Sequence, residues 1–294
     1  MADKKTRKTS GRLIAAVAVI LVLAAAVALV LVYYPPPQTT AAPSRRSAPQ
    51  STAGTPAREL AIMTWNLRGY PEKDAASRSW FSAELANLAP DILCVQEISD
   101  QAKVSTFMTT ESHFTRVAFQ DSSDGQDNAI FSDDQVELQQ LPTPAGFQHP
   151  ADVAYVSCGG FDATIVTVHL SWTDKAKREH EKSLLKSIVA EALKTDPDVI
   201  VCGDFNTQEP DISALAASCG LRVMTPSNVA TASTTHAGSR YDWFLVSPDL
   251  ADEEALGAEI VTFSGQDLPL AKKTSDHLPV RAKFMTDERF RDRR

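Results

Sequence analysis

Eight short apolar runs recur between residues 60 and 284, and each has about the length of a strand. They are "LAIMTWN", "DILCVQE", "NAIFS", "VAYVSC", "ATIVTVHL", "DVIVCGDFN", "YDWFLVS" and "LPVRAKF". Several are apolar almost throughout, which is typical of strands covered on both faces. A chain with this pattern has to place helices over its sheets, so the runs predict an α/β layered domain.

Two segments between these runs have the period of amphipathic helices. "SRSWFSAELANL" spaces Trp80, Phe81 and Leu85 along one face. The longer segment "TDKAKREHEKSLLKSIVAEALKT" predicts a second helix that begins after Thr173 or Asp174. Residues 57–286 therefore suit one folded domain, followed by a charged tail at 287–294.

The N-terminal region differs sharply from this domain. Residues 13–32 are uninterruptedly apolar, long enough to cross a bilayer, and 1–12 are basic. We therefore expect a transmembrane signal-anchor helix at 13–34, a cytoplasmic segment at 1–12 and a Pro/Ser/Thr/Ala-rich linker at 35–56. A cleaved signal peptide is the rival interpretation, but its apolar region would be unusually long. The expected location of the domain is membrane-anchored and extracytoplasmic, that is, periplasmic or extracellular.

The charge is unevenly distributed between these regions. Residues 1–56 carry seven Lys and Arg against the single acid Asp3, and the remainder has 22 Lys and Arg against 36 Asp and Glu. The folded part thus has a net charge of −14, within a total of −8. Such a balance lacks the basic footprint of a dedicated duplex-DNA binder, and a bound divalent cation would offset part of it.

The four cysteines do not reveal a pairing. Cys94 and Cys202 lie inside apolar runs and are expected in the core, whereas Cys158 and Cys219 have no assigned role. Three disulfide pairings remain open. The chain has no Cys-x-x-Cys, so the sequence suggests no structural zinc.

Six of the predicted strands end in, or next to, a side chain that can bind metal or phosphate. An isolated acid at such a position is usually a turn former or a helix cap. Six together suggest carboxylates, amides and imidazoles converging at one sheet edge, where they could hold a metal ion and activate water. The residues are Asn66, Glu97, His169, Asp204 with Asn206, Asp242, and Asp276 with His277.

The stretch "GDFN" shows this most clearly. Asp204 and Asn206 would project on the same side if the chain stays extended beyond the strand. Gly203 before them would let the backbone turn and approach a substrate closely.

The motifs "TWNLRG", "DILCVQEI", "NAIFS", "TVHL", "GDFN", "SRYDWFLVS" and "SDHLPV" occur in the order typical of one superfamily. Together they resemble the endonuclease/exonuclease/phosphatase superfamily, the fold of deoxyribonuclease I. The resemblance implies a four-layer sandwich of two packed mixed β-sheets flanked by helices, with the active site at one end.

The resemblance also implies roles for individual residues. Asn66, Glu97 and Asp276 would hold Mg²⁺, with Mn²⁺ as the alternative. His277, hydrogen-bonded to Asp242, would activate water or stabilise the transition state. Which of His277 and Asp204 is the base stays open. Asn206 would donate to a phosphate oxygen, and His169 would donate a proton or hydrogen bond to the leaving oxygen.

Some features depart from the family or fall outside its motifs. Arg68 stands shortly after Asn66, where abasic-site endonucleases place a second acid, which argues against a two-metal mechanism. No role is assigned to His149, His180 or His236. His149 and His236 lie in stretches that look like loops. Trp172 could stack on a base or lipid, although packing is the more usual role of a tryptophan.

The expected function is a divalent-metal-dependent phosphoesterase that hydrolyses phosphodiesters, or alternatively phosphomonoesters, by in-line attack of water. A nuclease and a phospholipid or small-phosphodiester hydrolase are the two leading forms of this hypothesis. The alternative from another class is a catalytically inactive, membrane-tethered binding module. Endo or exo action and the oligomeric state are left open by the sequence.

Overall fold

The computed structural model describes residues 58–70, 73–122, 125–226 and 233–286 of the protein. The predicted basic segment, the transmembrane segment 13–34, the linker and the charged tail lie outside these described residues. Among the helices within the described ranges, none combines the length and apolarity needed to span a bilayer.

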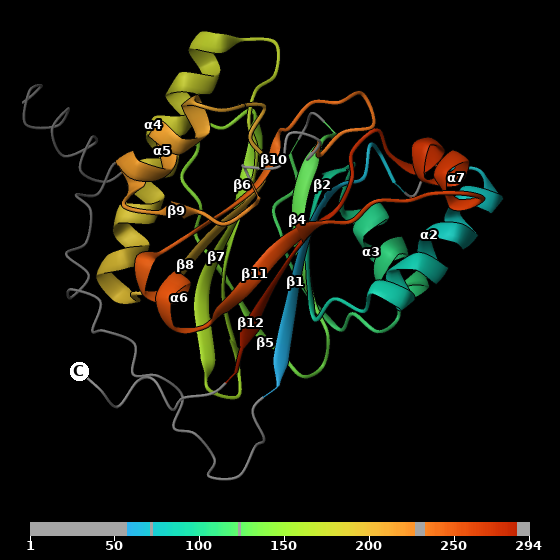
Figure 1. Ribbon diagram of the computed structural model, residues 1–294, viewed down its shortest axis with the longest axis horizontal. Helices are drawn as coiled ribbons and strands as arrows, with labels where there is room; N and C mark the ends of the chain where they lie inside the picture. Colours follow the sequence, from blue (N-terminus) through green and yellow to red (C-terminus); the bar gives the residue numbers. More distant parts are fainter. Residues whose placement is uncertain (1–57, 71–72, 123–124, 227–232, 287–294) are drawn as a thin grey trace, which may run out of the picture. The chain divides into compact units, whose positions relative to one another are not determined.

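The described residues form two six-stranded sheets with helices on their outer faces (Figure 1). The strands are β1 Glu59–Asn66, β2 Ile92–Ile98, β3 Arg116–Phe119, β4 Asp127–Ser132, β5 Glu137–Leu141, β6 His149–Cys158, β7 Phe161–His169, β8 Val199–Asp204, β9 Arg222–Val223, β10 Asp242–Val246, β11 Ala255–Ile260 and β12 Val280–Met285. The helices are α2 Ala75–Leu88, α3 Gln101–Thr110, α4 Lys175–Thr195, α5 Asp211–Cys219, α6 Pro248–Glu253 and α7 Asp267–Thr274.

Both sheets are mixed, as predicted. The first has the order β11-β12-β1-β2-β4-β3, and only its β1–β2 pair is parallel. The second has the order β5-β6-β7-β8-β10-β9, and only its β7–β8 pair is parallel. Each parallel pair needs a crossover, which α2 supplies between β1 and β2 and α4 supplies between β7 and β8.

Three clusters of buried side chains hold the layers together. The central one fills the space between the sheets and includes Ile62, Cys94, Ile165 and Cys202. A second packs α4 and α5 against the β7–β8 sheet, and a third, rich in aromatic rings, packs α2 and α3 against the β1–β2 sheet. Figure 1 shows these helices on opposite sides of the paired sheets. The layered domain expected from the apolar runs, and the sandwich that the family resemblance implies, are therefore present.

The predicted helices form as their sequences indicate. Asp174, one of the two expected caps, is the N-cap of α4 and accepts a hydrogen bond from the Lys177 backbone N–H at 3.0 Å. Cys94 and Cys202 lie in the inter-sheet core, and all four cysteines are free thiols.

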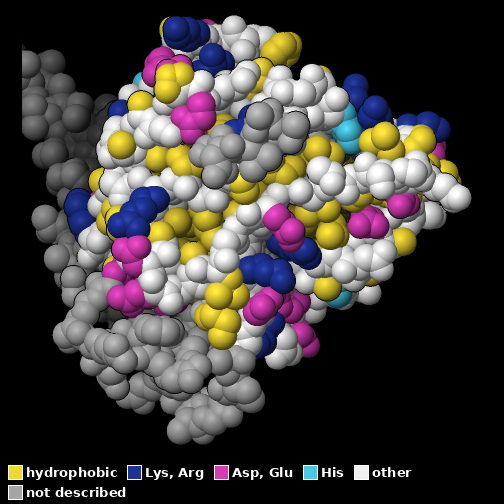
Figure 2. Space-filling view, viewed as in Figure 1, with side chains coloured by type: hydrophobic (Ala, Val, Ile, Leu, Met, Phe, Trp, Pro, Cys, Tyr) yellow, Lys and Arg dark blue, Asp and Glu magenta, His cyan; other side chains and the backbone are white. Residues whose placement is uncertain are grey.

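The surface charge is mixed on the face drawn in Figure 2. Lys and Arg side chains stand there in small groups among Asp and Glu, and the described part of that face carries no continuous basic stripe.

Candidate active site

The register of the second sheet places three predicted residues in one row. His169 at the end of β7 is the parallel partner of Asp204 at the end of β8. Asp242, the first residue of β10, is the antiparallel partner of the same Asp204. The three side chains are buried, with exposed fractions of 3%, 2% and 0%. Strand pairing alone therefore brings together residues that are far apart in the sequence.

The first sheet contributes Asn66 and Glu97 from neighbouring parallel strands. Glu97 is the extra residue of a β-bulge in β2, between Gln96 and Ile98 in the pairing with β4. Its φ is +61°, a left-handed conformation that is uncommon outside glycine and that re-aims the side chain. The Asn66 amide donates to Glu97 Oε1 at 2.9 Å and lies 3.3 Å from Asp204 Oδ2. Asn66 thus links the two sheets at this end.

The Asp204 carboxylate is the centre of the cluster. Its Oδ2 lies 3.6 Å from His277 Nε2 and 3.7 Å from His169 Nε2. Its Oδ1 accepts the backbone N–H of Asn206 at 2.9 Å. Two imidazoles therefore face one buried carboxylate, an arrangement suited to moving a proton or stabilising negative charge.

His277 forms the strongest contact of the site with Asp242. The distance from His277 Nδ1 to Asp242 Oδ2 is 2.8 Å, so the predicted hydrogen bond is present. Burial by itself would lower the pKa of His277, but the charge of Asp242 and the hydrogen bond to it raise that pKa to about 10. Burial raises the pKa of Asp242 to about 6, against the opposing charge of His277. The pair is therefore an imidazolium–carboxylate ion pair near neutral pH.

Ser275 positions the loop that carries His277. Its hydroxyl donates to the Asn66 backbone carbonyl at 2.6 Å and accepts the His277 backbone N–H at 2.9 Å. This hydroxyl ties the loop before β12 to the end of β1. The role is visible only in three dimensions, although Ser275 begins the "SDH" motif.

Asp276 lies at the exposed rim rather than among the buried groups. Its side chain is 56% exposed, and its Oδ1 lies 3.8 Å from Arg68 Nε. Burial and the charge of Arg68 lower the pKa of Lys73, whereas the charges of Glu97 and Asp276 raise it. These two predicted metal ligands therefore act on the same ammonium group, and the rim holds two cations near them.

The rim residues fit a hard divalent cation. Asn66, Glu97 and Asp276 supply amide and carboxylate oxygens, the donors that Mg²⁺ prefers, and few enough to leave room for water and a phosphate. The charges of Glu97 and Asp276 raise the pKa of Lys73, but burial and the charge of Arg68 outweigh them, so its pKa is lowered overall. A second group, Asp204, Asp242 and His277, has ligand atoms within 4.8 Å of one another. In that group Asp242 and His277 are already joined by their hydrogen bond of 2.8 Å, so Asn66, Glu97 and Asp276 remain the predicted metal ligands.

The structure corrects two expectations about "GDFN". The chain does not stay extended, because β8 ends at Asp204 and Asn206 adopts a φ of +46°. The Asn206 amide donates one of its two N–H groups to the Leu170 carbonyl at 2.9 Å, and its predicted contact with a phosphate oxygen stays a prediction. Gly203 is required by the adjacent strand, since a Cβ at that position would lie 2.1 Å from the Val168 carbonyl oxygen.

His149 is the residue that the sequence interpretation missed. It is the first residue of β6 rather than part of a loop, and it pairs in register with His169. The two imidazole rings stack with centroids 4.5 Å apart and planes 17° apart. A bulge between His149 and Asp152 sets this register, and no local pattern in the sequence indicates it.

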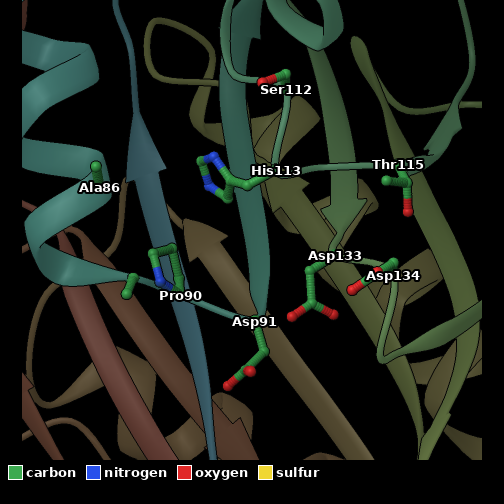
Figure 3. A pocket seen from close by; sticks show the side chains of 9 residues that line it. Ala86, Pro90, Asp91, Ser112, His113, Thr115, Asp133 and Asp134 are labelled. Carbon is green, nitrogen blue, oxygen red and sulfur yellow. The ribbon is translucent and has the colours of Figure 1, made fainter.

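The structure also contains a cavity of about 510 Å³, whose lining residues are drawn in Figure 3. Asp91, His113 and Asp133 are among its lining residues. Asp91 directly precedes β2, whose other end carries Glu97, and Asp133 directly follows the antiparallel β4. The cavity therefore lies at the other end of strands β2 and β4 and is not part of the candidate active site.

Several solved structures share this fold. TDP2 from D. rerio, in complex with a single-strand DNA product, is 18% identical, with 77% of this chain and 98% of that chain covered at a TM-score of 0.61. A mannosyl-6-phosphatase from Bacteroides thetaiotaomicron is 16% identical, with 76% and 99% covered at 0.57. The catalytic domain of human Nocturnin with bound sulfate is 17% identical, with 77% and 94% covered at 0.57. At these identities the likeness shows the fold alone.

A family model gives the closer assignment. No curated protein matches the chain. The model of the endonuclease/exonuclease/phosphatase family matches residues 63–277, a span that contains every candidate site residue from Asn66 to His277. The predicted resemblance is confirmed: the chain belongs to the endonuclease/exonuclease/phosphatase family.

Proposed function

We propose that the protein is a Mg²⁺-dependent phosphoesterase that hydrolyses phosphodiesters by in-line attack of water. The observation that carries this proposal is the contact chain from Asn66 through Asp204 to His277 and Asp242. It joins the ends of both sheets and contains acid, imidazole and amide groups whose successive distances are 3.3, 3.6 and 2.8 Å. The proteins that share this fold include one solved with a DNA product and, separately, a mannosyl-6-phosphatase. This supports phosphate esters as the substrate class.

The proposed roles follow from the contacts. Asp242 holds His277 as an imidazolium with Nδ1–H fixed, so that Nε2–H faces the reacting phosphate and stabilises charge developing there. Asp204 orients the attacking water and accepts its proton, since it lies between the two imidazoles. His169 Nε2 donates toward the leaving oxygen. A Mg²⁺ held by Asn66, Glu97 and Asp276, or Mn²⁺ in its place, would neutralise charge on the phosphate.

The tether is a separate part of the proposal. The apolar segment 13–34 and its basic N-terminal flank support an anchor with the catalytic domain on the outer side of the membrane. Protease treatment of intact cells that express the chain with a C-terminal epitope tests this topology. Loss of the epitope is expected, and protection of the epitope in intact cells but not in lysed cells would contradict it.

The activity is tested with the full chain and a panel of substrates. Supercoiled plasmid, sphingomyelin and a chromogenic phosphodiester are each incubated with Mg²⁺ or with EDTA. We expect Mg²⁺-dependent hydrolysis of at least one phosphodiester and none in EDTA. If no substrate is hydrolysed in the presence of Mg²⁺, the alternative of a tethered binding module replaces the enzyme.

A further inference from the structure

Trp172 lies on the rigid segment that leaves the candidate active site. It follows His169 by three residues, so the two Cα atoms are within about 11 Å of each other. Its side chain is 64% exposed, whereas Trp65, Trp80 and Trp243 are at most 8% exposed. The packing role usual for tryptophan therefore does not apply to this ring. An isolated exposed apolar side chain would need no explanation by itself, so the argument depends on how the segment is held.

The backbone on the near side of Trp172 is fixed to the site. The Leu170 N–H donates to the Asp204 carbonyl at 2.9 Å, and the Leu170 carbonyl accepts the Asn206 amide at 2.9 Å. The start of the segment therefore cannot move without disturbing the residues next to Asp204.

Helix α4 fixes the same segment from the other side. The Ser171 N–H donates to Glu181 Oε2 at 2.7 Å, and Arg178 donates to the carbonyls of Ser171 and Trp172 at 2.6 and 3.2 Å. Glu181 is fully buried, and its Oε1 accepts the Gln148 N–H at 2.8 Å. Burying a carboxylate is costly unless it is fully hydrogen-bonded. Here the buried Glu181 carboxylate holds a short loop, and the one large side chain of that loop, Trp172, faces solvent.

The surroundings of the ring favour a planar polar ligand over a bilayer. Residues 173–175, which follow it, are Thr, Asp and Lys, and all three are exposed. Among the described residues, Leu256 is the other large hydrophobic side chain that is exposed. A membrane-inserting surface needs a continuous apolar face. A single exposed aromatic ring on an anchored backbone, next to the proposed phosphoesterase site, is instead the kind of feature on which nucleobases stack.

We propose that Trp172 is a specificity-determining residue that stacks on a nucleobase of a single-stranded nucleic acid whose phosphodiester lies in the site. This assignment rests on the proposed phosphoesterase function. It names the substrate class of that site: the ring supplies a sequence-tolerant contact, and the buried cluster performs the hydrolysis.

The first test is binding without turnover, in EDTA. Because the other three tryptophans are buried, a base that stacks on the protein surface quenches mainly the fluorescence of Trp172. A single-stranded DNA oligonucleotide is expected to quench the wild-type protein but not Trp172→Phe. Equal quenching in both proteins would overturn the proposal, as would a response to phosphatidylcholine–phosphatidylglycerol vesicles with none to the oligonucleotide.

The second test compares kinetics on two oligonucleotides of equal length with Mg²⁺, one normal and one with its bases replaced by abasic tetrahydrofuran sites. Trp172→Ala is expected to raise KM for the normal strand about tenfold and to leave the abasic strand unchanged. Trp172→Phe should restore most of the loss, and the control Leu256→Ala should change neither. Equal effects of Trp172→Ala on both strands would overturn the stacking role. If the oligonucleotide quenches the fluorescence of the wild type but the wild type cleaves neither strand, the proposed function fails while the base contact stands.

Discussion

The buried half of the site and its exposed rim hold their charges in different ways. In the buried half, Asp242 and His277 are 2.8 Å apart, with almost no access to water around the carboxylate. On the rim, Asp276 and Arg68 are each 56% exposed and 3.8 Å apart, a contact of the kind that contributes about 0–1 kcal/mol. The fold therefore holds the Asp242–His277 pair much more tightly than the Asp276–Arg68 pair.

The largest effect is expected from removing the buried imidazole. His277→Ala should lower kcat about 10²–10⁴-fold, because the group facing the phosphate is lost and Asp242 is left buried without its partner. Initial rates on the substrate identified in the panel measure this. His180→Ala, which removes an exposed imidazole on α4, is the matched control and should keep full activity. Equal kcat values for His277→Ala and His180→Ala would show that the buried imidazole of His277 does not contribute to catalysis.

The next largest effect is expected at the proposed metal site on the rim. Glu97→Gln keeps the shape of the side chain but removes its charge, so the Mg²⁺ concentration for half-maximal activity should rise roughly tenfold or more. A Mg²⁺ titration of activity measures the shift, and excess Mg²⁺ should recover part of the rate. Glu191→Gln removes an exposed carboxylate on α4 and should leave the titration unchanged. An unaltered midpoint in Glu97→Gln would remove this residue from the metal site.

The buried ion pair has a distinct pH signature. The pKa of His277 is raised from 6.5 to about 10, so its protonation stabilises the fold, and this contribution is lost as the pH rises from 6.5 through 10. Asp242→Asn removes the largest source of the increase, and the pKa of His277 should fall toward its ordinary value. A ¹⁵N NMR titration of the imidazole in EDTA measures both proteins. A pKa near 10 in the variant would mean that other charges hold the imidazolium.

The smallest effect concerns Arg68. Arg68→Gln removes a positive charge beside Asp276, so Mg²⁺ should bind the free protein a few-fold more tightly, an effect that salt weakens. Calorimetric titration at two ionic strengths measures it. Weaker Mg²⁺ binding in the variant would indicate that Arg68 supports the carboxylates rather than competing with the cation.

The eight strands predicted from apolar runs all form, and the four that were missed have one property in common. β3, β5, β9 and β11 are the edge strands of the two sheets. Edge strands are not enclosed by neighbours on both sides, so they carry polar residues and lack a continuous apolar run: β5 reads "ELQQL" and is largely exposed. Central strands could be predicted because burial restricts their composition, and this restriction is weak at the edges.

The candidate site could be predicted as a set of residues but not as a geometry. Asn66, Glu97, His169, Asp204, Asp242 and His277 come together because they stand at strand ends, and strand ends could be predicted. The bulge that aims Glu97, the approach of Val168 that requires Gly203, and the stacking of His149 on His169 depend on pairing between distant strands. Such pairing leaves no local pattern, so these features appeared only with the structure.

The most direct test of the central claim is a double-mutant cycle on Asp204 and His277. If the two side chains act as one unit on one phosphate, Asp204→Asn and His277→Ala should each abolish nearly all Mg²⁺-dependent hydrolysis. The double variant should then lose little more than the more damaging single change. Losses that multiply in the double variant, or single variants with wild-type kcat, would contradict the claim that this buried cluster performs the hydrolysis.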